Sequence, residues 1–313
     1  MENILQVALA NPRGFCAGVE RAILIVEEAL EKYGAPIYVR HEVVHNKFVI
    51  KGLEKKGAIF IEDLKKVPKG SHIIFSAHGV SKLIKNEAQN FNLIPIDATC
   101  PLVTKVHNQV NRLVSKEYNI IMIGHKGHPE VEGTMGQIDS RNSNSKIFLV
   151  ENIKDVENLK IHKSKKIGFV SQTTLSMDDT ASIIESLKKK YPEIVGPKND
   201  DICYATQNRQ DAIKSMVKDH DLIIIVGSSN SSNSNRLVEI ANKEGVESML
   251  IDDVDTFNPK WLMNKKNIGI SAGASAPEVL VKDLIKKIKE HTKVSIKELD
   301  GIKENIIFKL PAI

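Results

Sequence analysis

The sequence repeats one order of residue patterns three times, and each repeat begins with a cysteine in a short loop before a helical pattern. The three cysteines are Cys16, Cys100 and Cys203. An apolar run typical of a strand follows each helical pattern, and a polar loop follows each run, at 40–46, 124–130 and 227–233. Strands that alternate with helices are typical of parallel sheets, so the repeat favours an α/β fold.

Polar residues recur at similar distances from the three cysteines. In the first polar loop of each repeat, the residues 29, 28 and 28 positions after the cysteine are His45, His128 and Ser231. A second strand and polar turn follow, and there the residues 62, 73 and 72 positions after the cysteine are His78, Thr173 and Ser275. The order of elements indicates an internal triplication in which little residue identity remains.

The triplication predicts the domain organisation. We expect three pseudo-equivalent α/β units with mainly parallel sheets around a central cavity, at 11–99, 100–199 and 200–287, and a C-terminal tail at 288–313. The N-terminal strand within residues 1–10 has no preceding unit, so we expect it to complete the sheet of the third unit and close the ring. Ligands bind at the carboxyl ends of parallel strands, where all three cysteines would lie.

The cysteines indicate a metal or redox site rather than disulfides. Their number is odd, no two of them form a Cys-x-x-Cys pair, and the N-terminus lacks the pattern of an export signal. A position just before a helix favours the thiolate through the backbone N–H groups and the helix dipole. Three thiolates without a fourth protein ligand suit either zinc with an open position or a 4Fe–4S cluster with one open iron.

A ring of hydrogen-bond donors accompanies the cysteines. It consists of His45, His78, His128, Ser231, Ser232, Asn233 and Ser275. These side chains suit a phosphate or diphosphate, and the Walker and dinucleotide-binding fingerprints do not occur in the sequence. Glu130, two residues after His128, would have a raised pKa in such a site and could donate a proton. Thr173 could position a substrate hydroxyl or cap the helix that follows.

Composition argues against several other classes of protein. No run of eighteen apolar residues occurs, so we expect no membrane partner. The N-terminus has no basic start, so we expect a cytoplasmic protein. The formal net charge of +5 fits an anionic small ligand as well as nucleic acid, but aromatic residues make up only 5% of the chain, which argues against stacking on nucleic-acid bases, so we expect no nucleic-acid partner.

Eight short motifs resemble those of the 4-hydroxy-3-methylbut-2-enyl diphosphate reductase family, also called the IspH or LytB family. They extend over nearly the whole chain and are Asn11-Pro-Arg-Gly-Phe-Cys-Ala-Gly-Val19, Ala77-His-Gly79, Asp97-Ala-Thr-Cys-Pro101, Gly127-His-Pro-Glu-Val-Glu-Gly133, Ser171-Gln-Thr-Thr-Leu-Ser176, Ile202-Cys-Tyr-Ala-Thr206, Asn230-Ser-Ser-Asn-Ser-Asn-Arg-Leu237 and Ala272-Gly-Ala-Ser-Ala-Pro277. The resemblance implies an iron–sulfur oxidoreductase of the non-mevalonate isoprenoid pathway. It would reduce and dehydroxylate an allylic diphosphate to isopentenyl diphosphate and dimethylallyl diphosphate.

The resemblance also implies roles for the residues above. Cys16, Cys100 and Cys203 would hold a 4Fe–4S cluster whose open iron binds the substrate hydroxyl. The diphosphate would be bound by His45, His78, His128, Ser231, Ser232, Asn233 and Ser275. Glu130 would deliver protons, Thr173 would help to hold the hydroxyl, and reduced ferredoxin or flavodoxin would supply electrons. Two interpretations from other classes stay open: an iron–sulfur redox sensor without turnover, and a zinc hydrolase of a phosphorylated metabolite.

Overall fold

The computed structural model describes residues 4–139, 143–162 and 165–313. The chain divides into two compact units, each of which is described by itself below. The first unit comprises the described residues of 1–20, 45–52 and 204–307, and the second comprises those of 21–44, 53–203 and 308–313. No helix in the part of the chain that the structure describes is long and apolar enough to cross a membrane.

Three sheets repeat one strand order. Their shared strands are β2 (Ile37–Arg40), β3 (Ala58–Ile61), β4 (His72–Phe75), β6 (Asn119–Ile123), β7 (Ile147–Val150), β8 (Ile167–Ser171), β9 (Leu222–Val226), β10 (Glu247–Ile251) and β11 (Asn267–Ala272). The first strand of each triplet lies between the next two strands of the chain, giving β3-β2-β4, β7-β6-β8 and β10-β9-β11. All these pairs are parallel, which confirms the predicted α/β class with parallel sheets.

Each sheet also receives the segment of chain that leads to a cysteine. In the first unit, β1 (Leu5–Leu9) pairs with β11 and runs towards Cys16. In the second unit, β5 (Ile94–Asp97) pairs with β4 and runs towards Cys100. A single parallel bridge from Val195 to β8 occupies the corresponding place before Cys203. The third strand of each repeat, which is β11, β4 or β8, is therefore bordered by the chain segment that leads to a cysteine.

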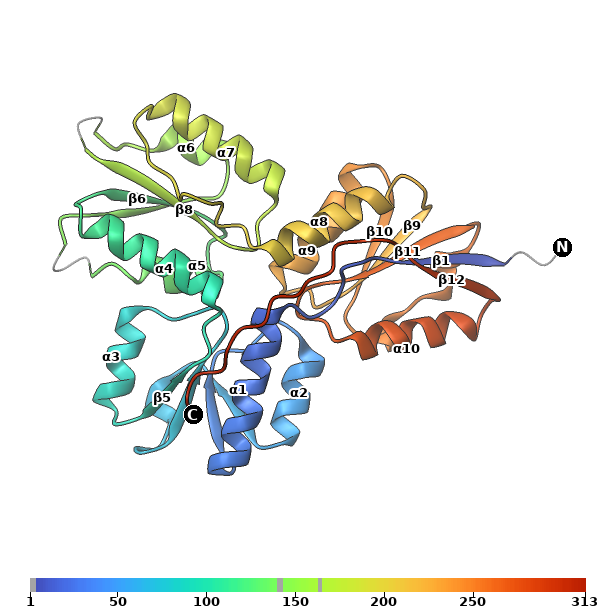
Figure 1. Ribbon diagram of the computed structural model, residues 1–313, viewed down its shortest axis with the longest axis horizontal. Coiled ribbons are helices and arrows are strands. Elements are labelled where there is room, and N and C mark those ends of the chain that lie inside the picture. Colours follow the sequence, from blue (N-terminus) through green and yellow to red (C-terminus); the bar gives the residue numbers. More distant parts are fainter. Residues whose placement is uncertain (1–3, 140–142, 163–164) are drawn as a thin grey trace. The chain divides into compact units, whose positions relative to one another are not determined.

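The first unit has one further strand. β12 (Val294–Glu298) pairs in parallel with β1, so the sheet order is β10-β9-β11-β1-β12 (Figure 1). The sequence analysis assigned these residues to a tail, whereas the structure places them at the edge of the sheet. The N-terminal strand lies between two strands from the far end of the chain, in the sheet where the sequence analysis expects it.

Helices cover both faces of the first unit's sheet. On one face, α8 (Tyr204–Met216) and α9 (Ser232–Lys243) pack with Ile223 and Ile225 of β9. On the other face, α10 (Glu278–Lys289) packs over β1, β9 and β11. A strand that is buried on both faces needs apolar residues at every position, which explains the continuous apolar run of β9.

The second unit repeats this layering around the sheet β7-β6-β8. The helices α6 (Ile153–Asn158) and α7 (Met177–Lys190) cover one face, and α4 (Pro101–Val114) and α5 (Pro129–Met135) cover the other. In the sheet that contains β4, α3 (Lys82–Asn90) packs against Ile73 and Phe75. The remaining helices, α1 (Ala17–Tyr33) and α2 (Lys47–Lys55), each contribute residues to both units.

Candidate active site

The three cysteines occupy equivalent positions in the backbone. Each cysteine N–H donates to the carbonyl of a residue just after the third strand of a repeat. The N···O pairs are Cys16 with Ala274 at 3.2 Å, Cys100 with Ala77 at 3.0 Å, and Cys203 with Thr173 at 3.0 Å. This shared contact fixes each cysteine at the carboxyl end of its sheet, where parallel α/β folds bind ligands. No disulfide joins them in the described residues.

The same contact corrects one correspondence that was counted from the sequence. Because Ala77, Thr173 and Ala274 accept the equivalent hydrogen bonds, each is followed by the equivalent residue of its repeat. The residue that corresponds to His78 and Ser275 is therefore Thr174 and not Thr173.

The predicted site residues fall into two groups, one in each unit. The group in the first unit consists of Cys16, His45, Ser231, Ser232, Asn233 and Ser275. The group in the second unit consists of Cys100, Cys203, His78, His128, Glu130 and Thr173. Hydrogen bonds connect several members within each group, as the following paragraphs describe.

In the second unit, the structure brings the predicted proton donor and the predicted hydroxyl-binding residue into contact. The Glu130 side chain is 2% exposed and lies in the first turn of α5. Its Oε1 accepts a hydrogen bond from the N–H of Thr173 at 2.7 Å, and its Oε2 accepts one from Oγ1 of Thr173 at 2.9 Å. The carbonyl of Thr173 in turn accepts the N–H of Cys203, so a single residue connects the acid to a cysteine.

The environment of Glu130 sets its proton affinity. Burial raises the pKa of Glu130 to about 7, and the nearby carboxylate of Asp201 adds to the rise, while the hydrogen bonds from Thr173 oppose it. A carboxyl group with a pKa near neutrality holds a proton in part of the molecules at pH 7 and can transfer it to a bound group. Glu130 is therefore suited to general acid chemistry.

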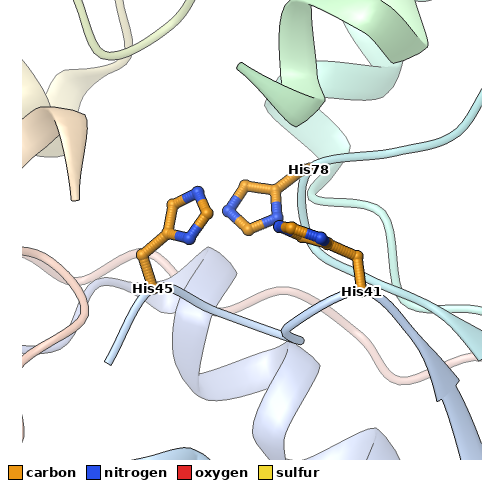
Figure 2. A group of neighbouring side chains, drawn as sticks. All are labelled: His41, His45 and His78. Carbon is orange, nitrogen blue, oxygen red and sulfur yellow. The ribbon is translucent and has the colours of Figure 1, made fainter. Parts of the chain in front are cut away.

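The histidines of the second unit lie close together after β2, β4 and β6. The rings of His78 and His128 meet edge to face, with centroids 5.9 Å apart. The ring of His41 meets that of His78 at the same distance, and Figure 2 shows both. His45, also drawn there, belongs to the first unit. Nδ1 of His41 lies 2.7 Å from Glu62, so His41 contacts a carboxylate on its other side.

In the first unit, the predicted residues gather around the loop between β11 and α10. Oγ of Ser275 donates to the carbonyl of His45 at 2.8 Å. Oδ1 of Asn233 accepts the N–H of Ala274 at 2.9 Å, and the carbonyl of Ala274 accepts the N–H of Cys16. The side chain of Ser231 caps α9 by accepting the N–H of Ser234. The N-terminus of α9 thus presents its first N–H groups beside this loop, as in many anion-binding sites.

A buried arginine that the sequence analysis did not identify holds the Cys16 loop. The Arg209 side chain is 0% exposed, and its Nη2 donates to the Gly14 carbonyl at 2.7 Å and to the Phe15 carbonyl at 3.3 Å. Its Nη1 forms an ion pair with Glu304 at 3.0 Å. Burial raises the pKa of the Cys16 thiol, while the N–H groups of α1 and the Arg209 charge lower it. Burial is the largest of these effects, so the pKa of Cys16 is raised overall, and the guanidinium opposes only part of the rise.

We expect Arg209→Met to lower the free energy of unfolding by about 3–5 kcal/mol, because it leaves the carboxylate of Glu304 without its buried partner. A urea titration followed by circular dichroism measures this. Arg209→Met combined with Glu304→Leu should recover part of the loss. Lys287→Met, which removes a surface ion pair with Glu290, is the control and should have a much smaller effect. Equal effects of Arg209→Met and Lys287→Met would contradict the structural role of Arg209.

A second polar residue without a local sequence signal lies near Cys203. The buried carboxylate of Asp201 accepts the N–H of Ser171 at 3.1 Å, and Nζ of Lys105 lies 3.6 Å away. Burial raises the pKa of Asp201 to about 6. Lys105 also donates to the carbonyls of Asn199 and Asp200. These contacts attach the segment before Cys203 to α4, whose N-cap is Cys100.

The thiols of the chain are of the chemical type that binds iron–sulfur clusters. Thiolates are the usual protein ligands of such clusters, and the chain has three thiols in equivalent loops. Each loop fixes its cysteine through a backbone hydrogen bond. A cationic side chain beside Cys16 offsets part of the negative charge that a thiolate brings.

Known proteins resemble this chain over nearly its whole length. The family model described as "LytB protein" matches residues 7–289. The 4-hydroxy-3-methylbut-2-enyl diphosphate reductase of Actinobacillus succinogenes is 56% identical over 307 residues, covering 98% of this chain and 97% of the relative. The enzyme of the same name from Nitrosomonas europaea is 55% identical over 314 residues, with the same coverage.

Solved structures agree with the sequence comparison. The E-1-hydroxy-2-methyl-but-2-enyl-4-diphosphate reductase from Plasmodium falciparum superimposes with a TM-score of 0.93 at 43% identity, covering 99% of this chain and 96% of that one. These matches confirm the resemblance noted from the eight motifs. By its sequence and its fold, the chain belongs to the LytB family of 4-hydroxy-3-methylbut-2-enyl diphosphate reductases.

Proposed function

We propose that the chain converts 4-hydroxy-3-methylbut-2-enyl diphosphate to isopentenyl diphosphate and dimethylallyl diphosphate, the last step of the non-mevalonate pathway. The allylic C–O bond breaks, a C–H bond forms, and water leaves, so each turnover consumes two electrons and two protons. The observation that carries this proposal is the buried carboxyl group of Glu130, held by Thr173 next to Cys203, in a member of the reductase family.

The proposal includes the cofactor. Cys16, Cys100 and Cys203 would hold a 4Fe–4S cluster with one iron that has no protein ligand. When bound, the cluster supplies electrons and a Lewis acid to the allylic alcohol. The equivalent backbone contacts of the three cysteines support a shared role for them. The electrons would come from outside the chain, from reduced ferredoxin or flavodoxin.

The other residues of the two groups would bind and orient the substrate. The diphosphate would accept hydrogen bonds from His45, His78, His128, Ser231, Ser232, Asn233 and Ser275. The first N–H groups of α9 add to these donors. Binding energy from the diphosphate would hold the allylic hydroxyl in place for reaction.

The protonation step would depend on the contact between Glu130 and Thr173. The hydroxyl of Thr173 donates a hydrogen bond to Glu130 and so orients the carboxyl group. The oxygen of the same hydroxyl could accept a hydrogen bond from the substrate hydroxyl. Protonation by Glu130 would convert the departing hydroxyl to water. The raised pKa makes the required proton available near neutral pH.

Anaerobic purification followed by iron, sulfide and zinc analysis and a turnover assay tests this function. With dithionite-reduced methyl viologen as the reductant, we expect a brown protein that releases both five-carbon diphosphates. A brown protein that yields neither product would favour the redox sensor. A colourless zinc protein that releases inorganic phosphate would favour the hydrolase.

A further inference from the structure

An open groove of about 720 Å³ lies on the second unit, beside Cys100. Its lining includes Arg21 of α1, Thr99, and Pro101, Lys105 and Arg112 of α4. Cys100 stands between two of these lining residues in the chain. The groove is therefore a place where a molecule from solution can approach a proposed cluster ligand, on the outer side of α4.

The outer face of α4 forms one wall of the groove. The opposite face of α4 is buried through Val103, Val106, Val110 and Leu113. On the outer face, Thr104, Asn108 and Arg112 are exposed and line the groove at intervals of four residues. Residues at this spacing lie on one side of a helix, and the row from first to last is about 12 Å long. The wall is long enough for contact with a protein surface.

The charge of the groove is positive. Its lining has three cationic side chains and one carboxylate, that of Asp97. Asp97 forms an ion pair with Lys85 at 2.8 Å. Lys105 lies near the buried carboxylate of Asp201, but the guanidinium of Arg21 donates only to the carbonyls of Thr99 and Lys309. Within the described residues, neither Arg21 nor Arg112 is paired with a carboxylate. No ion pair therefore neutralises these two charges in the described residues.

We propose that this groove is the docking surface for an acidic electron-carrier protein. The inference rests on the proposed function, which needs two electrons per turnover from an external donor. A carrier gives up one electron at a time and leaves oxidised, so its surface must come close to the cluster. A cationic surface raises the encounter rate of an anionic protein and orients it. Of the proposed cluster ligands, Cys100 is the one that stands between two lining residues of the groove, Thr99 and Pro101, in the chain.

Charge substitutions on the outer face of α4 test the proposal. In Asn108→Asp combined with Arg112→Glu, we expect kcat/KM for a reduced acidic ferredoxin to fall about tenfold at low ionic strength, because electrostatic steering is reversed. The difference from the unsubstituted protein should shrink as salt is added. Turnover with reduced methyl viologen, a small cation, should not fall. Lys282→Glu on α10 carries a similar charge change on an exposed helix and should leave both activities unchanged.

The outcomes separate the docking surface from the proposed function. An equal loss with ferredoxin and with methyl viologen, or no loss with either, would overturn the docking surface. If the unsubstituted protein showed no turnover with methyl viologen, the proposed function would fail. Titration with oxidised ferredoxin, followed by its NMR chemical shifts, would still decide the docking surface: weaker binding to the double variant supports it, and unchanged binding overturns it.

Discussion

Glu130→Gln should lower turnover by about 10²–10⁴-fold, the usual contribution of a general acid. Glutamine has nearly the shape of the protonated carboxyl group and can still accept the N–H of Thr173. We therefore expect the fold, the iron content and the binding of inorganic diphosphate to stay the same. Steady-state turnover with reduced methyl viologen measures the loss.

The pH profile provides a second measurement of the same role. Because burial raises the pKa of Glu130 to about 7, the protonated acid is present below this pH and is lost as the pH rises through it. Turnover of the unsubstituted protein should therefore fall above about pH 7, and the residual turnover of Glu130→Gln should lack this decrease.

A neighbouring glutamate offers a matched control. Glu132 lies two residues further along α5 and is exposed. Glu132→Gln should keep normal turnover and a normal pH profile. If Glu130→Gln also kept normal turnover, the assignment of Glu130 as the proton donor would be wrong.

Replacement of any one cysteine by serine should remove the cluster and abolish turnover. Two thiolates are too few for a cluster that already has one iron without a protein ligand. We expect loss of the brown absorbance and of nearly all iron and sulfide in anaerobically purified Cys16→Ser, Cys100→Ser and Cys203→Ser. Far-ultraviolet circular dichroism would show whether the sheets still form.

A substitution in the proposed diphosphate site separates cluster loss from substrate loss. Ser231→Ala removes the cap of α9 and a proposed diphosphate donor, but no sulfur. It should keep the full iron and sulfide content and bind inorganic diphosphate more weakly. A cysteine variant that retained a stable cluster with the normal spectrum would not have lost a ligand, and that cysteine would leave the proposed set.

The sequence predicts the strongly apolar parts of the fold and misses the weakly apolar ones. β6 and β9 end directly before the predicted polar loops at 124–130 and 227–233, and their apolar runs are unbroken because both faces are buried. The edge strands β3, β7 and β10 were not predicted, since each contains partly exposed residues and has no clear alternation. β12 is mostly exposed and depends on its pairing with β1, which no local pattern indicates.

The candidate site shows the same limit. The cysteines carry a local signal because each stands just before a helix, and Glu130 carries one because it lies in the first turn of α5, in a polar segment after β6. Arg209 and Asp201 carry none, since their importance comes from partners far along the chain, such as Glu304, which lies 95 positions after Arg209. The contact between Glu130 and Thr173 spans 43 positions and could be proposed only from the family motifs.

The position of β1 has a consequence for biosynthesis. A ribosome releases this strand first, but both strands that flank it are made much later. The loop that carries Cys16 can therefore reach its final form only when most of the polypeptide has emerged. A cluster held by all three cysteines, as proposed above, would therefore be assembled only after most of the chain has been synthesised.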